Sequence, residues 1–368
     1  MRIVLPNYKE GLVNVISSIE KYYGFKSKHN SLKELDNILK EKKSKNIVLV
    51  LFDGLGYNIL KRNKRLCPNL NKYLVRSISS TFPSTTMAAR TTIESGLTPI
   101  EHGWLGWDMY FKKFDNVITL TKNYVAATKE KITDYHIART LLKYKSLVDK
   151  VKEKEGYNAN KISLYLESKK YNLNKTLKRI KDITSNNLKN YIYLYINDPD
   201  HTFHKCGVNS LISKFKLFYL DKKFKKLCKS LDDTTIIALA DHGHINVEYI
   251  TLSDYPNITK MLDGNLSIDK RACSFRVKKG YKNTFKRELK KILKDDFIIL
   301  SSKEVDEQKL FGEGIKNKYY NDALGDFFAI SISNKSIRLD NKVHRHKSSH
   351  AGLTEDEMLV PLIVYKGD

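Results

Sequence analysis

The hydrophobic pattern of the chain alternates between two kinds of segment. Unbroken runs of apolar and β-branched residues occur at Asn46–Phe52, Tyr191–Ile196, Thr235–Ala240 and Leu359–Tyr365. Such short runs are typical of strands that are buried on both faces. Between them lie stretches with apolar residues at helical spacing, for example Lys169–Asn190 and Ser210–Ser230. This alternation predicts an α/β fold, with a mostly parallel sheet covered by helices on both faces.

Two other parts of the chain depart from this alternation. Residues 1–45 predict two helices, the second opened by a capping-box signature at Ser31–Glu34. Residues 257–341 contain RACSFRVKK, a charged helical stretch and two further strand-like runs, which predict a small α+β insertion that caps the site. The α/β core then comprises residues 1–256 and 342–368, with residues 1–45 as its N-terminal helical segment.

Composition indicates a globular protein without a membrane span. The chain has 368 residues, of which 41% are hydrophobic, enough for one large domain with an insertion. Its longest apolar runs, IVLVLF and IIALA, are far shorter than the roughly 20 residues that cross a bilayer. The N-terminus lacks the apolar stretch of a signal peptide, and the four cysteines show no C-x-x-C pairing. We therefore expect a cytoplasmic protein.

The net charge of +25 is the one feature that favours nucleic acid as a partner. The lysines are spread along the whole chain, however, together with abundant Asn, Ile and Tyr. That mixture is typical of compositional bias rather than of a binding face. We therefore expect a small anionic substrate, whose approach a basic surface accelerates, and not nucleic acid. The oligomeric state is left open.

Metal-binding residue types follow the predicted strands where each strand ends. The candidate ligands are Asp53, Asp200, His204, Asp241, His242 and His350. Because ligands of open α/β sheets bind beyond the carboxyl ends of the strands, we expect the four that follow strand-like runs, Asp53, Asp200, Asp241 and His242, to meet at one edge. Carboxylate oxygen and imidazole nitrogen together suit Zn²⁺, with Mn²⁺ or Fe²⁺ as alternatives. Six such ligands are enough for two divalent ions.

A segment rich in serine and threonine, SSTFPSTTMAARTTIESG, lies between the first two of these ligands. Its second half is compatible with a helix that ends at Gly96. A hydroxyl at the start of a helix lies where N–H groups and the helix dipole favour an anion. Beside a metal, it can lose its proton near neutral pH and attack phosphorus. Ser84 or Thr85 can equally serve as the helix cap.

In combination, several motifs resemble the alkaline phosphatase superfamily, in particular its nucleotide pyrophosphatase/phosphodiesterase-like branch. They are FDGLG, TFPSTT followed by GLTPIEHG, DPDHTFHKCG, ADHGH and HAGLTEDEMLVPLIV, and they extend over residues 46–365. The resemblance implies an alkaline-phosphatase-like core with two metal ions. One zinc ion is then expected at Asp53, Thr86, Asp241 and His242. The other is expected at Asp200, His204 and His350.

The same resemblance implies a threonine nucleophile. Members of the family place it ten residues before the glycine that corresponds to Gly96, which points to Thr86. Members that read Thr-Phe-Pro point instead to Thr81, and Thr85 is a third alternative. The expected reaction is hydrolysis of a phosphodiester or pyrophosphate bond through a phospho-Thr intermediate, with a small phosphate ester or a nucleotide as substrate.

One departure from the family bears on the substrate. Phosphodiesterases of this branch often carry an Asn beyond the His-Gly pair that contacts a phosphate oxygen, but here the spacing falls on Trp107, with Asp108 next. Trp104 and Trp107 could stack on a base or aryl group, or could belong to the core. Arg90 is the nearest candidate for contact with a dianionic phosphate, so a monoester substrate is not excluded.

Alternative functions differ in the residues that they need. A sulfatase needs a C/S-x-P-x-R motif, which TFPSTTMAAR lacks. A phosphoglycerate-mutase-like enzyme uses Ser and a larger insertion than residues 257–341. A phosphomonoesterase or phosphonate monoester hydrolase of the same superfamily is the main alternative. A catalytically inactive, metal-bound nucleic-acid-binding module is the alternative of a different class, and it predicts salt-sensitive binding without hydrolysis of aryl phosphate esters.

Overall fold

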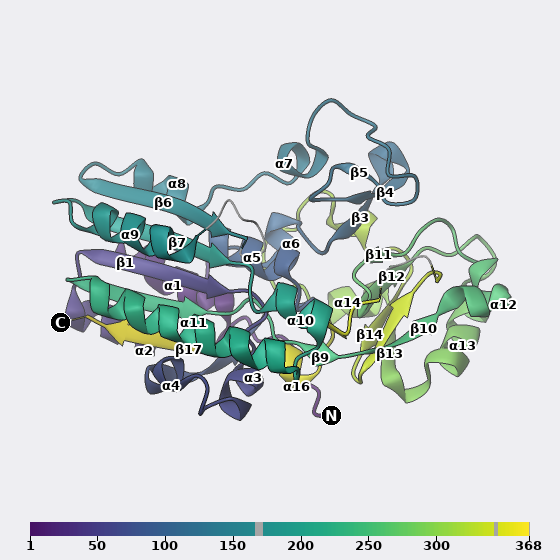
Figure 1. Ribbon diagram of the computed structural model, residues 1–368. Coiled ribbons are helices and arrows are strands. Elements are labelled where there is room, and N and C mark those ends of the chain that lie inside the picture. Colours follow the sequence, from purple (N-terminus) through teal and green to yellow (C-terminus); the bar gives the residue numbers. More distant parts are fainter. Residues whose placement is uncertain (166–171, 342–344, 368) are drawn as a thin grey trace.

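A six-stranded sheet forms the centre of the larger part of the molecule (Figure 1). The computed structural model describes residues 1–165, 172–341 and 345–367. In spatial order the strands are β2 (Leu74–Ser79), β17 (Leu359–Lys366), β8 (Thr234–Leu239), β1 (Asn46–Phe52), β7 (Lys189–Ile196) and β6 (Tyr157–Leu164). Strands β8, β1, β7 and β6 run parallel, whereas β17 is antiparallel to both of its neighbours. The mostly parallel sheet expected from the sequence is therefore confirmed.

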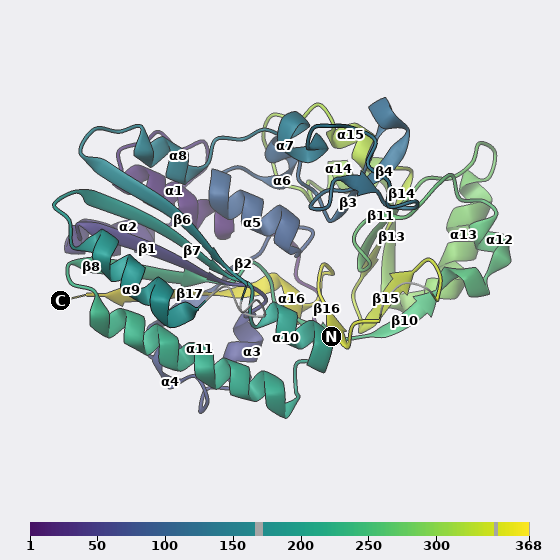
Figure 2. The same ribbon diagram turned by 45° about the horizontal axis from the view of Figure 1, so that its top comes forward.

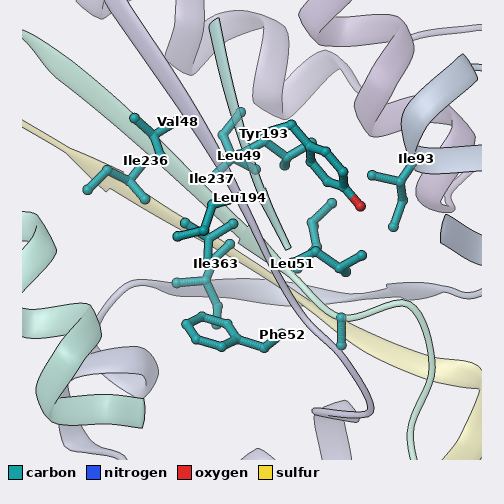
Figure 3. Close-up of a cluster of buried hydrophobic side chains, with 14 of the residues drawn as sticks. Val48, Leu49, Leu51, Phe52, Ile93, Tyr193, Leu194, Ile236, Ile237 and Ile363 are labelled. Carbon is teal, nitrogen blue, oxygen red and sulfur yellow. The ribbon is translucent and has the colours of Figure 1, made fainter. Parts of the chain in front are cut away.

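The four unbroken apolar runs form four adjacent strands of this sheet, β17, β8, β1 and β7, and they supply its core. Every residue of β1 and β8 is buried. Figure 3 shows buried side chains of this sheet, among them Leu49 and Phe52 of β1 and Ile237 of β8. An apolar side chain at every position is what burial on both faces requires, because successive side chains of a strand point to opposite faces.

Helices cover both faces of the large sheet (Figure 2). One face carries α1 (Leu12–Tyr22), α5 (Thr86–Ser95) and α8 (Leu147–Lys152). The other carries α3 (Tyr57–Arg62), α4 (Pro68–Lys72), α9 (Leu173–Thr184) and α11 (Leu211–Ser230). Of the predicted helix at Lys169–Asn190, residues 169–171 lie outside the described part of the chain.

The N-terminal segment forms α1 and α2 (Lys33–Lys42), as predicted. The capping box expected at Ser31 is wrong, because Leu32 occupies the N-cap position and makes no side-chain cap. The Ser31 hydroxyl instead donates a 2.7 Å hydrogen bond to Asp36. The hydrogen bond from Ser31 therefore stabilises the first turn of α2 instead of capping its N-terminus.

A second, antiparallel sheet lies beyond the carboxyl ends of the parallel strands (Figure 1). Its spatial order is β13 (Phe297–Ser301), β14 (Phe327–Ser331), β12 (Ala272–Phe275), β11 (Ser267–Ile268), β3 (Asp108–Phe111), β4 (Asn116–Thr119) and β5 (Tyr124–Val125). Helix α13 (Lys282–Leu293) packs against it through Phe285. Two distant chain segments thus build one sheet. The division into a core and an insertion at 257–341 stays a prediction. Residues 108–125, which lie outside the predicted insertion, form part of the same sheet.

Shorter elements complete the two parts of the molecule. The helices are α6 (Pro99–His102), α7 (Ile137–Leu141), α10 (Asp200–Cys206), α12 (Pro256–Thr259), α14 (Ser302–Glu307), α15 (Tyr320–Ala323) and α16 (Glu355–Met358). Two small ladders pair β9 (Ile245–Asn246) with β16 (Ser348–Ser349), and β10 (Glu248–Thr251) with β15 (Lys335–Arg338). Among the described residues, no helix is both long and apolar enough to cross a membrane. The four cysteines are free.

Candidate active site

The carboxyl ends of β1, β7 and β8 bring the predicted ligands to one edge of the large sheet. Asp53 directly follows β1, and Asp241 lies two residues after the end of β8. Asp200 opens α10, just after β7. The backbone N–H of Asp200 donates to the carbonyl of Asp53 at 2.9 Å, which joins the ends of β1 and β7 directly. Ligands from distant parts of the chain are therefore placed by the strand order.

The first group consists of Asp53, Asp241 and His242, all buried. One ligand atom from each residue lies within 4.8 Å of the others. Thr86, the first residue of α5, faces this group. Its Oγ1 lies 3.2 Å from His242 Nε2 and 3.5 Å from Asp53 Oδ1. A hydroxyl at a helix start thus lies against a carboxylate and an imidazole of this group.

The second group consists of Asp200, His204, His350 and His244, again within 4.8 Å of one another. The rings of His350 and His242 stack with centroids 3.7 Å apart, so the two groups are adjacent. All six predicted ligands are therefore brought together. His244 was missed, although it is the second histidine of the quoted ADHGH motif, two residues after His242.

Three of the histidines share one hydrogen-bond pattern. Nδ1 lies 3.0 Å from the Gly243 carbonyl in His242, 2.8 Å from the Ser348 carbonyl in His204, and 3.1 Å from the Ser84 carbonyl in His350. Because a carbonyl can only accept, each Nδ1 carries the proton. The Nε2 atom of each ring faces a carboxylate, and it offers its lone pair to a metal once it carries no proton. Histidines that bind metals are held in this way.

One carboxylate oxygen of the first group has no hydrogen-bond partner. Asp241 Oδ1 accepts from the backbone N–H groups of Gly54 and His242, each at 3.0 Å. Asp241 Oδ2 is buried, without a hydrogen bond among the described residues, and lies 3.6 Å from His242 Nε2. A buried carboxylate oxygen left in this way is costly unless a cation meets it. The donor set therefore fits a divalent metal.

His244 differs from the other three histidines. Its Nε2 lies 2.6 Å from Asp200 Oδ1, and its Nδ1 lies 3.0 Å from the Ser348 hydroxyl. A contact of 2.6 Å between nitrogen and a carboxylate oxygen is a hydrogen bond, so Nε2 donates to Asp200 and Nδ1 accepts from Ser348. His244 thus orients the carboxylate of a candidate ligand.

The buried charges of the first group alter one another's pKa values. Burial lowers the pKa of His242, but the neighbouring carboxylates of Asp241 and Asp53 outweigh it and raise that pKa to about 10. Burial, and then the charges of Asp241 and Asp200, raise the pKa of Asp53 well above its usual value. In the absence of a metal, a proton on His242 therefore supplies the positive charge that a bound cation would otherwise supply.

The hydroxyls of the alternative nucleophiles Thr81 and Thr85, and of the possible helix cap Ser84, donate to other groups. The Thr81 hydroxyl donates to the Pro83 carbonyl at 3.1 Å, and the Ser84 hydroxyl donates to the Gly352 carbonyl at 2.8 Å. Thr85 occupies the N-cap position of α5, but its hydroxyl donates to Asp269 at 2.8 Å instead of capping the helix. Among these candidates only Thr86 faces the carboxylates, so the geometry favours Thr86.

The contacts of Arg90 disfavour a role in phosphate binding. Its Nε donates to Glu94 at 2.9 Å, and its guanidinium lies 3.9 Å from the centre of the Tyr195 ring. The Tyr195 hydroxyl in turn donates to Asp53 Oδ2. Tyr195 therefore orients the candidate ligand Asp53, and Arg90 packs against the Tyr195 ring. The sequence had indicated neither of these supporting roles.

The two tryptophans have different environments. Trp104 is buried in a hydrophobic cluster, and its Nε1 donates to the Leu142 carbonyl at 2.8 Å. It therefore belongs to the core, which was one of the two expectations. Trp107 is half-buried, and its backbone N–H donates to the carbonyl of Ile268 in the smaller sheet. A stacking role for Trp107 stays a prediction.

An α/β sheet with two carboxylate–histidine groups and a hydroxyl at its edge defines the class of hydrolases that act on phosphate esters. Residues 47–350 match the protein family described as type I phosphodiesterase / nucleotide pyrophosphatase. The chain belongs to this family and is a hydrolase. The resemblance to the nucleotide pyrophosphatase/phosphodiesterase branch is thereby confirmed.

Solved structures of this family share the fold. Murine ectonucleotide pyrophosphatase/phosphodiesterase 5 superposes with a TM-score of 0.68 at 16% identity, over 87% of each chain. The human protein of the same name gives 0.67 at 17%, again over 87% of each chain. An inactive threonine-to-alanine variant of the murine protein, in complex with AMP, gives 0.66 at 15% and the same coverage. No curated protein matches the chain.

Proposed function

We propose that this protein is a two-metal phosphodiesterase that hydrolyses phosphodiester or pyrophosphate bonds through a phospho-Thr intermediate at Thr86. The observation that carries the proposal is the shared hydrogen-bond pattern of His204, His242 and His350. Each ring donates from Nδ1 to a backbone carbonyl and turns Nε2 toward a carboxylate. An Nε2 atom that faces a carboxylate needs a positive charge between the two, which a proton supplies in the absence of metal and which a bound metal ion would supply in its place.

Two sets of side chains would hold the ions. One set is Asp53, Thr86, Asp241 and His242, and the other is Asp200, His204 and His350. Mixed nitrogen and oxygen donors favour Zn²⁺, with Mn²⁺ and Fe²⁺ as alternatives. Bound cations would supply positive charge that lowers the pKa of a hydroxyl and stabilises the developing charge on phosphorus oxygens.

The reaction begins with Thr86. Its Oγ1 loses a proton to solvent and forms a bond to phosphorus, while the bond from phosphorus to the leaving oxygen breaks and its electron pair stays on that oxygen. The first backbone N–H groups of α5 have no partner within the helix, so they would be available to the phosphate at its N-terminus. These donors take the place of the Asn that the chain lacks at Trp107.

Water completes the cycle by attacking the phosphorus of phospho-Thr86. The bond to Thr86 Oγ1 breaks, the hydroxyl regains a proton, and a phosphate monoester leaves. During both steps the Tyr195 hydroxyl and His244 keep Asp53 and Asp200 in fixed orientations through their hydrogen bonds. Pre-oriented carboxylates need no rearrangement as charge develops.

Two observations favour a diester substrate that contains a nucleotide. The Arg90 guanidinium is engaged by Glu94 and Tyr195, which leaves it unsuited to a dianionic monoester. The murine relative was solved with AMP, which supports a nucleotide as the group transferred. A cytoplasmic location, expected from the cysteine content, remains part of the proposal.

The test compares hydrolysis of bis-p-nitrophenyl phosphate with that of p-nitrophenyl phosphate, after loading with zinc or manganese and again after chelation. Faster cleavage of the diester, lost on chelation, is the expected result. A preference for the monoester would replace the proposal with a phosphomonoesterase or phosphonate monoester hydrolase. No hydrolysis of either compound with metal bound would favour the inactive nucleic-acid-binding module.

A further inference from the structure

Four large apolar side chains are exposed together on the first half of helix α11. Their exposed fractions are 82% for Leu211, 61% for Ile212, 70% for Phe215 and 41% for Phe218. Because these positions are one, four and seven residues apart from the first, they share one side of the helix. Single exposed apolar residues are ordinary, whereas a contiguous group of them marks a surface that binds something.

The side of α11 that packs on the large sheet is a different one. Its buried residues are Ser213, Leu217, Leu220, Asp221, Phe224, Leu227 and Cys228. They recur with the period of the helix and join the core, while the opposite side lies on the outside of the molecule (Figure 2). The exposed apolar group is therefore not needed to hold α11 in the fold.

The remainder of the exposed side is positively charged. Helix α11 carries seven lysines, namely Lys214, Lys216, Lys222, Lys223, Lys225, Lys226 and Lys229. Within the described part of the chain, only Lys216 of these forms a salt bridge, with Asp198 at 3.0 Å. The single acid of the helix, Asp221, is buried, and it accepts hydrogen bonds from the Asn69 side chain and the Leu70 backbone. No acid of α11 thus offsets its lysines at the surface.

The lysines continue the side of the helix that begins with the apolar group. Lys222 and Lys226 follow Phe215 by two and three turns. The Lys222 ammonium lies 5.0 Å from the centre of the Phe218 ring. Helix α9, which packs beside α11, adds further exposed cations at Lys175, Lys178, Arg179 and Lys181, against one exposed acid, Asp182. The positive surface therefore extends beyond a single helix.

An exposed apolar group that is bordered by cations matches the chemistry of an anionic lipid surface. Apolar side chains of such a helix enter the boundary between headgroups and acyl chains, and lysines reach the lipid phosphates. A second copy of this chain fits less well, because it would bring the same lysines together. We propose that α11 docks the protein on membranes that contain anionic lipids, with Leu211, Ile212 and Phe215 inserted at the level of the headgroups.

The docking surface adjoins the candidate active site. The apolar group lies at the end of α11 that follows α10, and α10 carries Asp200 and His204 (Figure 1). Docking would therefore take place at the edge of the large sheet where the candidate ligands meet. The contact would be peripheral, because α11 is too polar to cross a membrane. The inference does not depend on the proposed hydrolysis, since lipid binding requires no turnover.

Co-sedimentation of the full chain with vesicles tests the inference. Phosphatidylcholine vesicles with about 30% phosphatidylserine should bind the protein about tenfold or more tightly than pure phosphatidylcholine vesicles. The double variant Ile212→Ser/Phe215→Ser should weaken binding to the anionic vesicles by about tenfold or more, because apolar insertion is lost. Lys222→Gln/Lys226→Gln should weaken it by about tenfold, because two contacts with lipid phosphates are lost.

Matched controls make the same substitutions elsewhere. Ile132→Ser/Ile315→Ser replaces two exposed apolar residues outside α11, and Lys112→Gln/Lys113→Gln replaces two exposed lysines directly after β3. Both controls should bind the anionic vesicles as tightly as the wild type. All four variants should keep a Tm within about 2 °C of the wild type, since each replaces only exposed side chains. A control that loses as much binding as its α11 counterpart would overturn the inference, because overall charge or hydrophobicity would then explain the binding.

Three other results would also overturn the inference. The first is that the wild type binds neither kind of vesicle, or both equally. The second is a dimer in sedimentation velocity that Phe215→Ser dissociates, without vesicle binding, which would assign this side of α11 to a second copy of the chain. The third is binding to a single-stranded oligonucleotide but not to vesicles, which would assign the lysines to nucleic acid.

Discussion

The Thr85 hydroxyl donates a 2.8 Å hydrogen bond to the Asp269 carboxylate and so joins the start of α5 to the smaller sheet. Asp269 follows Ile268, which has a positive φ of 73°. A positive φ is strained for a β-branched residue, and such strain persists only where the surroundings enforce it. Here the Ile268 carbonyl accepts from Trp107, and Thr85 directly precedes Thr86. The smaller sheet therefore helps to position the proposed nucleophile.

A double-mutant cycle tests this coupling. Thr85→Val and Asp269→Ala should each lower kcat by about tenfold, because a displaced nucleophile reacts slowly. The double variant should be no slower than either single variant, since both changes remove the same hydrogen bond. The readout is kcat for bis-p-nitrophenyl phosphate at equal metal content. Losses that multiply in the double variant would contradict a shared role.

The choice of nucleophile is tested by replacing the hydroxyls one at a time. Thr86→Ala should abolish turnover of bis-p-nitrophenyl phosphate and leave both metals bound, because three other side chains remain at the first site. Thr81→Val is the matched control, since its hydroxyl bonds to the Pro83 carbonyl, and it should retain most of the activity. The reverse pattern would assign the nucleophile to Thr81.

Two buried tyrosines of β7 provide a comparison within a single strand. The Tyr195 hydroxyl donates to Asp53, whereas the Tyr193 hydroxyl has no hydrogen-bond partner among the described residues. Tyr195→Phe should weaken zinc affinity by about tenfold to a hundredfold, as expected when a partner of a ligand is removed. Tyr193→Phe should leave zinc affinity unchanged and cost no stability. Competition with a chromophoric chelator measures the affinity, and equal affinities in the two variants would contradict the role of Tyr195.

The large sheet could be predicted because its signals are local. Each apolar run in the sequence forms one strand, and an acid or histidine after a strand end needs only the parallel direction of the strands to reach the common edge. The positions of Asp53, Asp200, Asp241 and His242 were accessible for the same reason, and the resemblance added the metal-binding roles, including those of His204 and His350.

The strands that residues 108–125 add to the smaller sheet, and the supporting residues, could not be predicted in this way. Strands β3 to β5 have two to four residues each, and they join the smaller sheet through the pairing of β3 with β11, which lies more than 100 residues later, so no local signal marks them. Tyr195 appears in the sequence as one more apolar residue of a buried strand, and Asp269 as a turn residue. Their functions depend on contacts between distant segments, which only the folded chain reveals.

The proton held by His242 makes metal binding depend on pH. Its pKa is lowered by burial but raised overall to about 10 by Asp241 and Asp53, so Nε2 is protonated at neutral pH before a metal binds. A metal must displace that proton, and below pH 10 each fall of one pH unit should weaken the affinity of the first site by about tenfold. Zinc titration of chelator-treated protein between about pH 6 and 8, corrected for the titration of the competing chelator, measures the slope. An affinity that stays constant over this range would show that His242 is not a ligand.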